Sequence, residues 1–300
     1  MKSVKEIYPP PPAMEGYKPL AREIMDDDRR WFYEELKRYG KFTGMAWILS
    51  PEPQKRTLPV PTIEEIVSSK EFIETETGKE KYLLEKLKVS EEQIKMVHML
   101  TIGQRDNPSW LMLRRGRLTA SNFGAVLNAK RVTPSLLKRV LGEYSLSGVQ
   151  AINWGINNEA EAVKAFVQAT GLTVEDSGLW LDPSGILGAS PDGLVGTNYL
   201  LEVKCPFTQR HSEMTEAVKS KDFYLEKNQN GSYSLKKTHV YWHQVQGQLY
   251  LTQRQICFFV VWTLKETLVL QINKDEQWEQ NLDTLKTFFE EHMLKKILEV

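Results

Sequence analysis

Two carboxylates and a lysine stand close together in SPDGLVGTNYLLEVKCP, residues 190–206. Glu202 and Lys204 end an apolar run that is typical of a β-strand, and side chains two apart on a strand point to one face. Asp192 reaches the same place if its strand pairs alongside. The two carboxylates and the Val203 carbonyl suit a hard cation such as Mg²⁺ or Mn²⁺. Such an ion polarises a phosphoryl oxygen and activates water, and the lysine steadies the developing charge.

Each of these residues also has an ordinary structural explanation. Pro-Asp-Gly is common turn chemistry, and a Glu and a Lys two apart often form a solvated strand face. The apolar neighbours Leu200, Leu201 and Val203 favour a site, because charges at the end of an apolar strand need partners or a metal.

A further carboxylate, Glu159, lies in NWGINNEAEAVKAF, where the apolar spacing predicts an amphipathic helix over residues 158–170. A carboxylate near the start of a helix is favoured by the helix dipole alone. The alternative is that Glu159 faces the site and helps to hold the metal ions.

A basic cluster occurs in LRRGRLTAS, where Arg114, Arg115 and Arg117 precede Thr119 and Ser121. Hydroxyls, arginines and the N–H groups of a helix start together make an anion site. The structural alternative is helix capping by the hydroxyls beside solvated arginines.

Two glutamines, Gln244 and Gln246, occur in YWHQVQGQLYL, on or beside an expected helix. Either amide could reach the site or a nucleic acid, although isolated glutamines are commonly surface residues. His243 lacks metal-ligand spacing and is expected to be structural.

The elements around these motifs predict an α/β fold with a central mixed β-sheet flanked by helices. The alternating apolar runs predict strands over residues 178–181, 188–195, 199–204, 256–264 and 267–272. Helices are expected after Thr119–Ser121, over 158–170, over 240–251 and over 276–294.

The first hundred residues have a different texture, with charged helical stretches broken by prolines. Helices are expected over residues 20–39, 79–87 and 90–100, the last with a capping box between Ser90 and Gln93. The expected organisation is a helical appendage at 1–100 and a catalytic domain at 101–300.

Composition leaves the function open. The 39 basic and 39 acidic side chains give a formal net charge of zero, which does not favour a nucleic-acid binder but permits a local basic groove. Two cysteines, Cys205 and Cys257, make no disulfide framework or zinc spacing, so an intracellular protein is expected. The longest apolar run, at 256–262, is too short to cross a bilayer, so no membrane role is expected.

Four motifs in order resemble the lambda-exonuclease and YqaJ group of viral recombinase nucleases, within the PD-(D/E)XK superfamily. They are LRRGRLTAS, WGINNEAEA, SPDGLV followed by LEVKCPFTQR, and HQVQGQLYL, and together they cover residues 110 to 264.

The resemblance implies a PD-(D/E)XK nuclease core and a Mg²⁺-dependent exonuclease, with Mn²⁺ as a substitute, that degrades one strand of duplex DNA from a free 5′ end. It leaves the oligomeric state and a single-strand annealing partner open. It assigns metal binding to Asp192, Glu202, Glu159 and the Val203 carbonyl, catalysis to Lys204 with Gln244 beside it, and phosphate handling to Arg114, Thr119, Ser121 and Arg210.

Two alternatives stay open on the same residues. An endonuclease or structure-specific nuclease would use the same core, because one fold supports many cutting modes. The other alternative is an inactive DNA-binding module, which would be free to lose any of the three charged residues. Because Asp192, Glu202 and Lys204 are all present, the sequence argues against it. The polar stretch 220–239 departs from the family pattern and is expected to form a loop over the substrate.

Overall fold

The computed structural model describes residues 23–41, 43–50, 58–143 and 148–299, and it divides into two compact units at Thr57/Leu58. The first unit contains α2 (Asp26–Arg38) and α3 (Gly44–Leu49). Three aspartates open α2 and two basic residues close it, as the helix dipole favours. The helix expected over residues 20–39 corresponds to α2, and residues 20–22 lie outside the described ranges.

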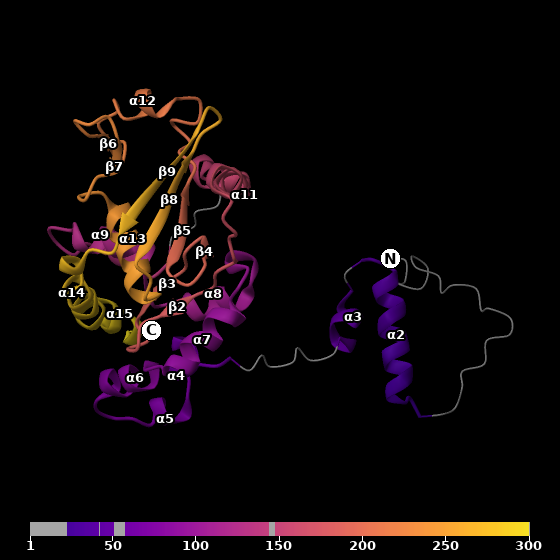
Figure 1. Cartoon of the computed structure of the whole chain (residues 1–300). Helices are drawn as coiled ribbons and strands as arrows, with labels where there is room; N and C mark the ends of the chain where they lie inside the picture. Colours follow the sequence, from indigo (N-terminus) through magenta and orange to yellow (C-terminus); the bar gives the residue numbers. More distant parts are fainter. Residues whose placement is uncertain (1–22, 42, 51–57, 144–147, 300) are drawn as a thin grey trace, which may run out of the picture. The chain divides into compact units, whose positions relative to one another are not determined.

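A four-stranded mixed sheet forms the centre of the second unit (Figure 1). Its order is β4 (Gly193–Val195), β5 (Tyr199–Lys204), β8 (Ile256–Trp262) and β9 (Thr267–Asn273). Strands β5 and β8 are parallel, and the two outer pairs are antiparallel.

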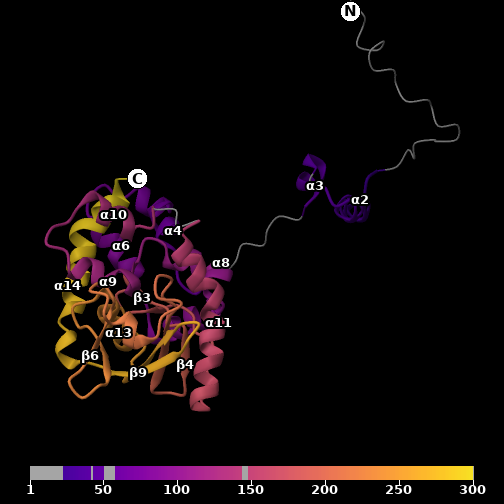
Figure 2. The same ribbon diagram turned by 90° about the horizontal axis from the view of Figure 1, so that it is seen from above.

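Two long helices cover the faces of this sheet, α11 (Gln150–Thr170) on one side and α13 (Val240–Leu251) on the other (Figure 2). Side chains alternate along β5. Leu201 therefore packs in one apolar cluster with Phe166 of α11, and Leu200 packs in another with Leu249 of α13. The predicted α/β fold with a mixed sheet flanked by helices is confirmed.

A second, three-stranded sheet has the order β1 (Leu118–Thr119), β3 (Leu187–Ala189) and β2 (Trp180–Leu181). Helix α9 (Ala120–Leu127) follows β1 directly and packs closely on α13. The approach requires glycine, since a Cβ at Gly124 would lie 2.5 Å from the Val240 Cα and a Cβ at Gly247 would lie 2.4 Å from the Phe123 ring.

The helices before the sheet belong to the second unit. They are α4 (Ile63–Val67), α5 (Lys70–Ile73), α6 (Lys79–Leu87), α7 (Glu91–Leu100), the 3₁₀ turn η1 (Gln104–Asp106) and α8 (Pro108–Arg114). Leu83 and Leu87 of α6 lie in the same apolar cluster as Leu118 and Phe289. This shared core explains why the compact unit begins at Leu58 rather than at the boundary expected near residue 100. The Ser90–Gln93 capping box is present.

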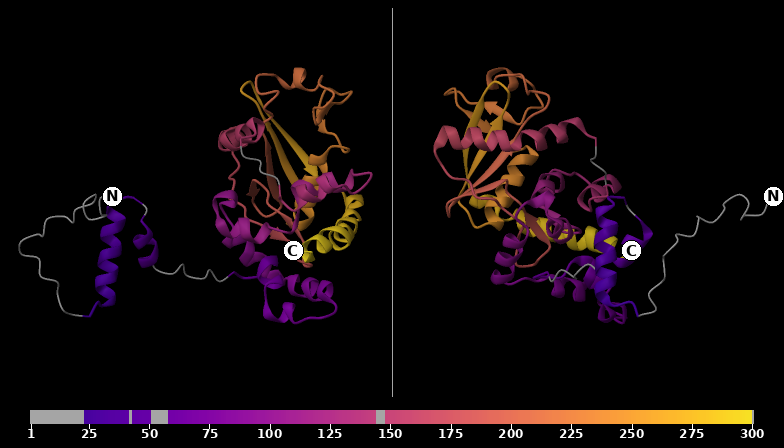
Figure 3. Two further views of the ribbon diagram at one scale, coloured as in Figure 1. Left: turned by 180° about the vertical axis from the view of Figure 1, so that it is seen from behind. Right: turned by 90° about the vertical axis from the view of Figure 1, so that its right-hand side faces the viewer.

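The remaining elements complete the second unit. They are α10 (Pro134–Val140), α12 (Met214–Ala217), the hairpin of β6 (Leu225–Lys227) and β7 (Tyr233–Leu235), η2 (Glu276–Trp278), α14 (Asn281–Phe288), the π-helical turn η3 (Phe289–Met293) and α15 (Leu294–Leu298). The last three are in yellow in Figure 3; α14 contacts α9, and α15 contacts α6. None of the helices in the described ranges is long and apolar enough for a bilayer crossing.

Three expected elements differ from the structure. The strand expected over 188–195 is two strands in two sheets, β3 and β4, because Pro191 and Asp192 lie between them. Helix α11 begins at Gln150, eight residues before its expected start, so Glu159 lies within the helix and not near its first turn. The terminal helix expected over 276–294 is interrupted.

Candidate active site

Glu202 and Lys204 project together from β5 toward α13, as their spacing predicts. The Glu202 side chain is 2% exposed, and one of its oxygens forms an ion pair with the Lys204 ammonium. The Gln244 amide donates to Glu202 Oε1 at 2.6 Å, and the Gln248 amide donates to Oε2 at 2.7 Å. The buried carboxylate is therefore held by one cation and two amides.

Gln248 is a site residue that the sequence interpretation missed. Residues four apart share one face of a helix, so its spacing from Gln244 was the available signal. Gln246 instead faces elsewhere, donating to the Asn273 carbonyl at 3.0 Å and accepting from the Asp275 N–H at 2.8 Å. Of the two glutamines that could reach the site, Gln244 does so, and Gln246 is buried and bonded to the backbone of residues 273 and 275.

Lys204 lies between Glu202 and an aromatic ring. Its Nζ is 4.6 Å from the centre of the Tyr241 ring, on the first turn of α13. Burial alone would lower the Lys204 pKa, but the carboxylates of Glu202 and Asp192 hold this pKa above its usual value. Lys204 is therefore a fixed cation beside the acidic residues.

Asp192 joins the site through the backbone of β5. Its Oδ2 accepts from the Val203 N–H at 2.7 Å. The N–H and C=O of one residue point to the same side of a strand, so the Val203 carbonyl is directed to the Asp192 side. Burial and the nearby Glu202 carboxylate raise the Asp192 pKa well above its usual value.

Glu159 and Asp192 line one cavity of about 300 Å³, together with Gly103, Gln104, Arg105, Asp106, Trp110, Asp176 and Ser177. Burial raises the Glu159 pKa, against the opposing effect of the Arg105 guanidinium. Four carboxylic acids and one arginine thus surround this space.

The acidic cavity suits a divalent cation, because hard cations prefer carboxylate oxygens and the lining has four carboxylic acids against one arginine. Among the described residues, however, no three His, Cys, Asp or Glu side chains are close enough together to hold an ion. Their assignment as metal ligands therefore stays a prediction.

Three of the four predicted phosphate-handling residues line a second cavity, of about 670 Å³: Arg114, Thr119 and Ser121. Asn122 and Arg139, which the sequence interpretation did not select, line it too, and the Arg139 Nε donates to Asn122 Oδ1 at 3.1 Å. Thr119 occupies the N-cap of α9 without a side-chain capping bond; its hydroxyl lies 3.3 Å from the Ser121 hydroxyl.

The side chain of Trp110 links the two cavities. The Arg114 guanidinium lies 4.2 Å from the centre of the Trp110 ring, and Trp110 also lines the cavity of Glu159 and Asp192. Its indole N–H donates to the Ser190 hydroxyl at 2.8 Å. Because Ser190 precedes Asp192 by two residues, this bond anchors the Trp110 ring beside the segment that carries Asp192. The basic cavity thus lies next to the acidic one.

The remaining candidates lie apart from both cavities. Arg210 donates to the Phe207 carbonyl at 2.6 Å and lies 4.2 Å from the Phe207 ring centre, and it does not line the cavity of Arg114. His243 accepts from the Trp278 indole at 3.0 Å, a structural contact as expected.

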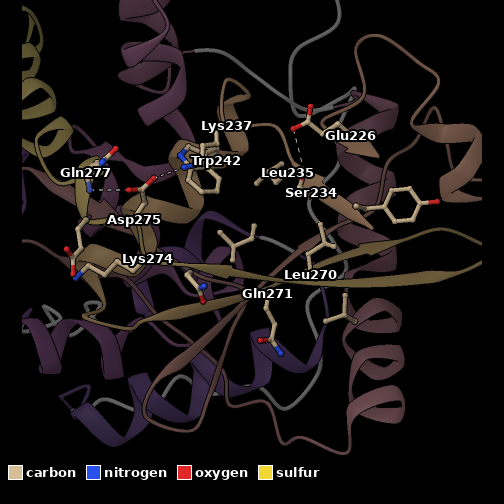
Figure 4. Close-up of a pocket in the computed structure, with 15 residues that line it drawn as sticks. Glu226, Ser234, Leu235, Lys237, Trp242, Leu270, Gln271, Lys274, Asp275 and Gln277 are labelled. Atoms are coloured by element: carbon tan, nitrogen blue, oxygen red, sulfur yellow. Dashed lines mark hydrogen bonds and ion pairs between the residues drawn. The ribbon is translucent and has the colours of Figure 1, made fainter. Parts of the chain in front are cut away.

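A wider cavity, of about 940 Å³, lies between the β6–β7 hairpin and the edge strand β9 (Figure 4). None of the predicted site residues lines it. The polar stretch 220–239 was expected to form a loop over the substrate. Part of it forms this hairpin, which lines a groove separate from the candidate site.

Residues 109–255 match the family described as the YqaJ-like viral recombinase domain, which confirms the resemblance seen in the motifs. All the predicted site residues lie inside this range.

Two alkaline nucleases are similar in sequence. That of Autographa californica nuclear polyhedrosis virus is 27% identical over 203 residues, covering 61% of this chain and 48% of the viral protein. That of Orgyia pseudotsugata multicapsid polyhedrosis virus is 24% identical over 207 residues, covering 63% and 48%. The chain therefore spans about half the length of these relatives.

A crystal structure of an alkaline exonuclease, LHK-Exo from Laribacter hongkongensis, is also similar. It shares 27% sequence identity with this chain, covers 63% of this chain and 94% of its own, and has a TM-score of 0.49.

Proposed function

Because residues 109–255 match the YqaJ-like viral recombinase domain, we propose that this protein is a metal-dependent DNA exonuclease that degrades one strand of linear duplex DNA from the 5′ end. One observation carries the proposal: at the end of β5, Lys204 forms an ion pair with Glu202, and Asp192 accepts from the Val203 N–H between them. A basic cavity lies next to this group.

The acidic residues would hold the metal. Asp192, Glu202, Glu159 and the Val203 carbonyl would supply oxygen ligands for two Mg²⁺ ions, with Mn²⁺ as a substitute. Mg²⁺ held by these residues would supply an activated water and a positive charge against the scissile phosphate.

The other groups orient the reaction. Gln244 and Gln248 fix the Glu202 carboxylate in one rotamer, and this preorganisation costs nothing when the substrate arrives. Lys204 stays protonated beside the acids and stabilises the charge that develops on the phosphate oxygens.

The basic cavity would take the end of the DNA. A 5′-terminal phosphate carries more negative charge than an internal diester, and Arg114 with the hydroxyls of Thr119 and Ser121 binds it through charge-assisted hydrogen bonds. Arg139 adds a second guanidinium to the same cavity. Holding the terminal phosphate there places the next diester at the acidic cavity.

The test is digestion in Mg²⁺ of three DNAs: linear duplex with 5′-phosphate, linear duplex with 5′-hydroxyl, and closed circles. We expect the phosphorylated linear duplex to be degraded fastest and the circles to be left intact. Rapid nicking of circles would favour the endonuclease alternative, and binding of all three without cleavage would favour an inactive DNA-binding module.

A further inference from the structure

The loop before α8 reaches into the acidic cavity from outside the matched family range. The residues of η1, Gln104–Asp106, precede residue 109, where the family match begins, yet all three line the cavity of Glu159 and Asp192. This loop therefore adds side chains to the site that none of the four motifs contains.

Gln104 fixes this loop to the site. Its amide donates to the Pro191 carbonyl at 2.7 Å and to the Ser177 carbonyl at 3.1 Å, so it is bonded to the residue before Asp192. Its backbone has φ of +46°, a left-handed conformation that costs a non-glycine residue energy and persists where surrounding contacts hold it.

Arg105 is the basic side chain that this loop presents. Among the described residues that line the cavity it is the only base, beside Asp106, Glu159, Asp176 and Asp192. Its side chain is exposed, and no carboxylate in the described ranges lies within ion-pair distance of it. The guanidinium is therefore available to a ligand.

We propose that Arg105 binds a phosphodiester of the DNA strand at the acidic cavity, and that Gln104 is the positioning residue that holds it there. The inference rests on the proposed function. Four carboxylic acids repel a DNA backbone, and a guanidinium at the same cavity offsets that repulsion and offers paired donors to phosphate oxygens.

The test is the salt dependence of duplex binding. A fluorescent linear duplex with a 5′-phosphate is titrated by anisotropy in Ca²⁺ at several salt concentrations. Arg105→Ala should weaken binding about fivefold near 0.1 M salt and lower the slope of log affinity against log salt by about one, as expected for one lost phosphate contact. Arg105→Lys should keep most of the slope, because it keeps the charge.

Two further variants separate positioning and general charge from this contact. Gln104→Ala should lower the slope in the same direction, a readout that a purely structural role would not change. Lys295→Ala removes an exposed charge on α15, outside the cavity lining, and should leave the slope unchanged.

Each outcome is decisive. An Arg105→Ala slope equal to that of the unmodified protein overturns the inference, and if the unmodified protein still degrades linear DNA, the proposed function stands. A reduced slope in a protein that cleaves no DNA supports the Arg105 contact and removes the exonuclease. No salt-dependent duplex binding by the unmodified protein removes both.

Discussion

At the scale of single residues, the site is a buried carboxylate whose partners come from two elements. Glu202 is bound by Lys204 on its own strand and by Gln244 and Gln248 from α13. Buried charges of this kind persist only when each is paired or hydrogen-bonded, so a change to one partner is felt by the others.

Lys204→Ala should reduce cleavage by at least about a hundredfold, because it removes a preorganised charge beside the reacting phosphate. Duplex affinity should change little, because the Lys204 ammonium is already paired with the Glu202 carboxylate and is not a free cation for the DNA backbone. Loss of one charged partner should also cost about 2 kcal/mol of stability. Rates, anisotropy and urea unfolding measure the three effects, and a variant that cleaves normally would show that the lysine has only a structural role.

Tyr241 should matter through its ring rather than its hydroxyl. Tyr241→Phe keeps the aromatic face 4.6 Å from Lys204 Nζ and should keep the cleavage rate within about twofold. Tyr241→Leu removes the cation–π contact, worth about 1–2 kcal/mol, and should lower the rate about tenfold. Equal rates for the two variants would mean that the ring does not position the lysine.

At the scale of elements, the parts with strong local patterns were predictable. The expected spans 199–204 and 240–251 coincide with β5 and α13, and both carry site residues. Long-range contacts were not predictable from local pattern. Packing of distant segments places Arg105 and Trp110 at the acidic cavity. It also leaves Arg210 outside the cavity that Arg114 lines.

Three histidines act as hydrogen-bond acceptors at the ends of elements or between them. The Nδ1 atoms of His98, His239 and His243 accept from Gly178 N–H, Tyr241 N–H and the Trp278 indole. Burial lowers the pKa of each below the ordinary 6.5. The folded state therefore binds fewer protons than the unfolded state below about pH 6.5, and these residues lose their stabilising effect as pH falls.

His98→Gln keeps an acceptor for Gly178 but cannot titrate. Its unfolding free energy should fall less than that of the unmodified protein between about pH 7.5 and about pH 5.5. Urea unfolding of both proteins at the two pH values is the measurement, and the raised carboxyl pKa values of the site cancel in the comparison. An identical pH dependence would contradict the assigned role of His98.

At the scale of the whole molecule, the elements that carry the candidate site share their core with helices that precede them. Eight apolar side chains between residues 58 and 100 are buried: Val60, Ile63, Ile66, Phe72, Leu83, Leu87, Val89 and Val97. At about 1.5–3 kcal/mol each, their burial contributes on the order of 12–24 kcal/mol, which is as large as or larger than the net stability of a typical domain.

A chain beginning at Leu58 should therefore fold and cleave DNA, whereas a chain beginning at Thr101 should not fold. Thermal unfolding and DNA digestion of the two truncated proteins test this. A folded, active chain that starts at Thr101 would show that the helices before it are an appendage, as the texture of the sequence suggested. An inactive but folded chain from Leu58 would show that residues 1–57 contribute to the reaction.

The proposed function requires the carboxylate of Asp192 to serve a metal-dependent nuclease centre. The most direct measurement is Mg²⁺-dependent digestion of linear duplex DNA by Asp192→Asn, which keeps an acceptor for the Val203 N–H and removes only the charge. Asp182→Asn is the matched control, because Asp182 is also shielded from solvent and accepts a backbone N–H, that of Leu187 at 3.1 Å, outside both cavities. We predict that Asp192→Asn loses at least about a hundredfold in rate while Asp182→Asn stays within about threefold. Near-normal digestion by a folded Asp192→Asn protein would show that this carboxylate is not needed for cleavage.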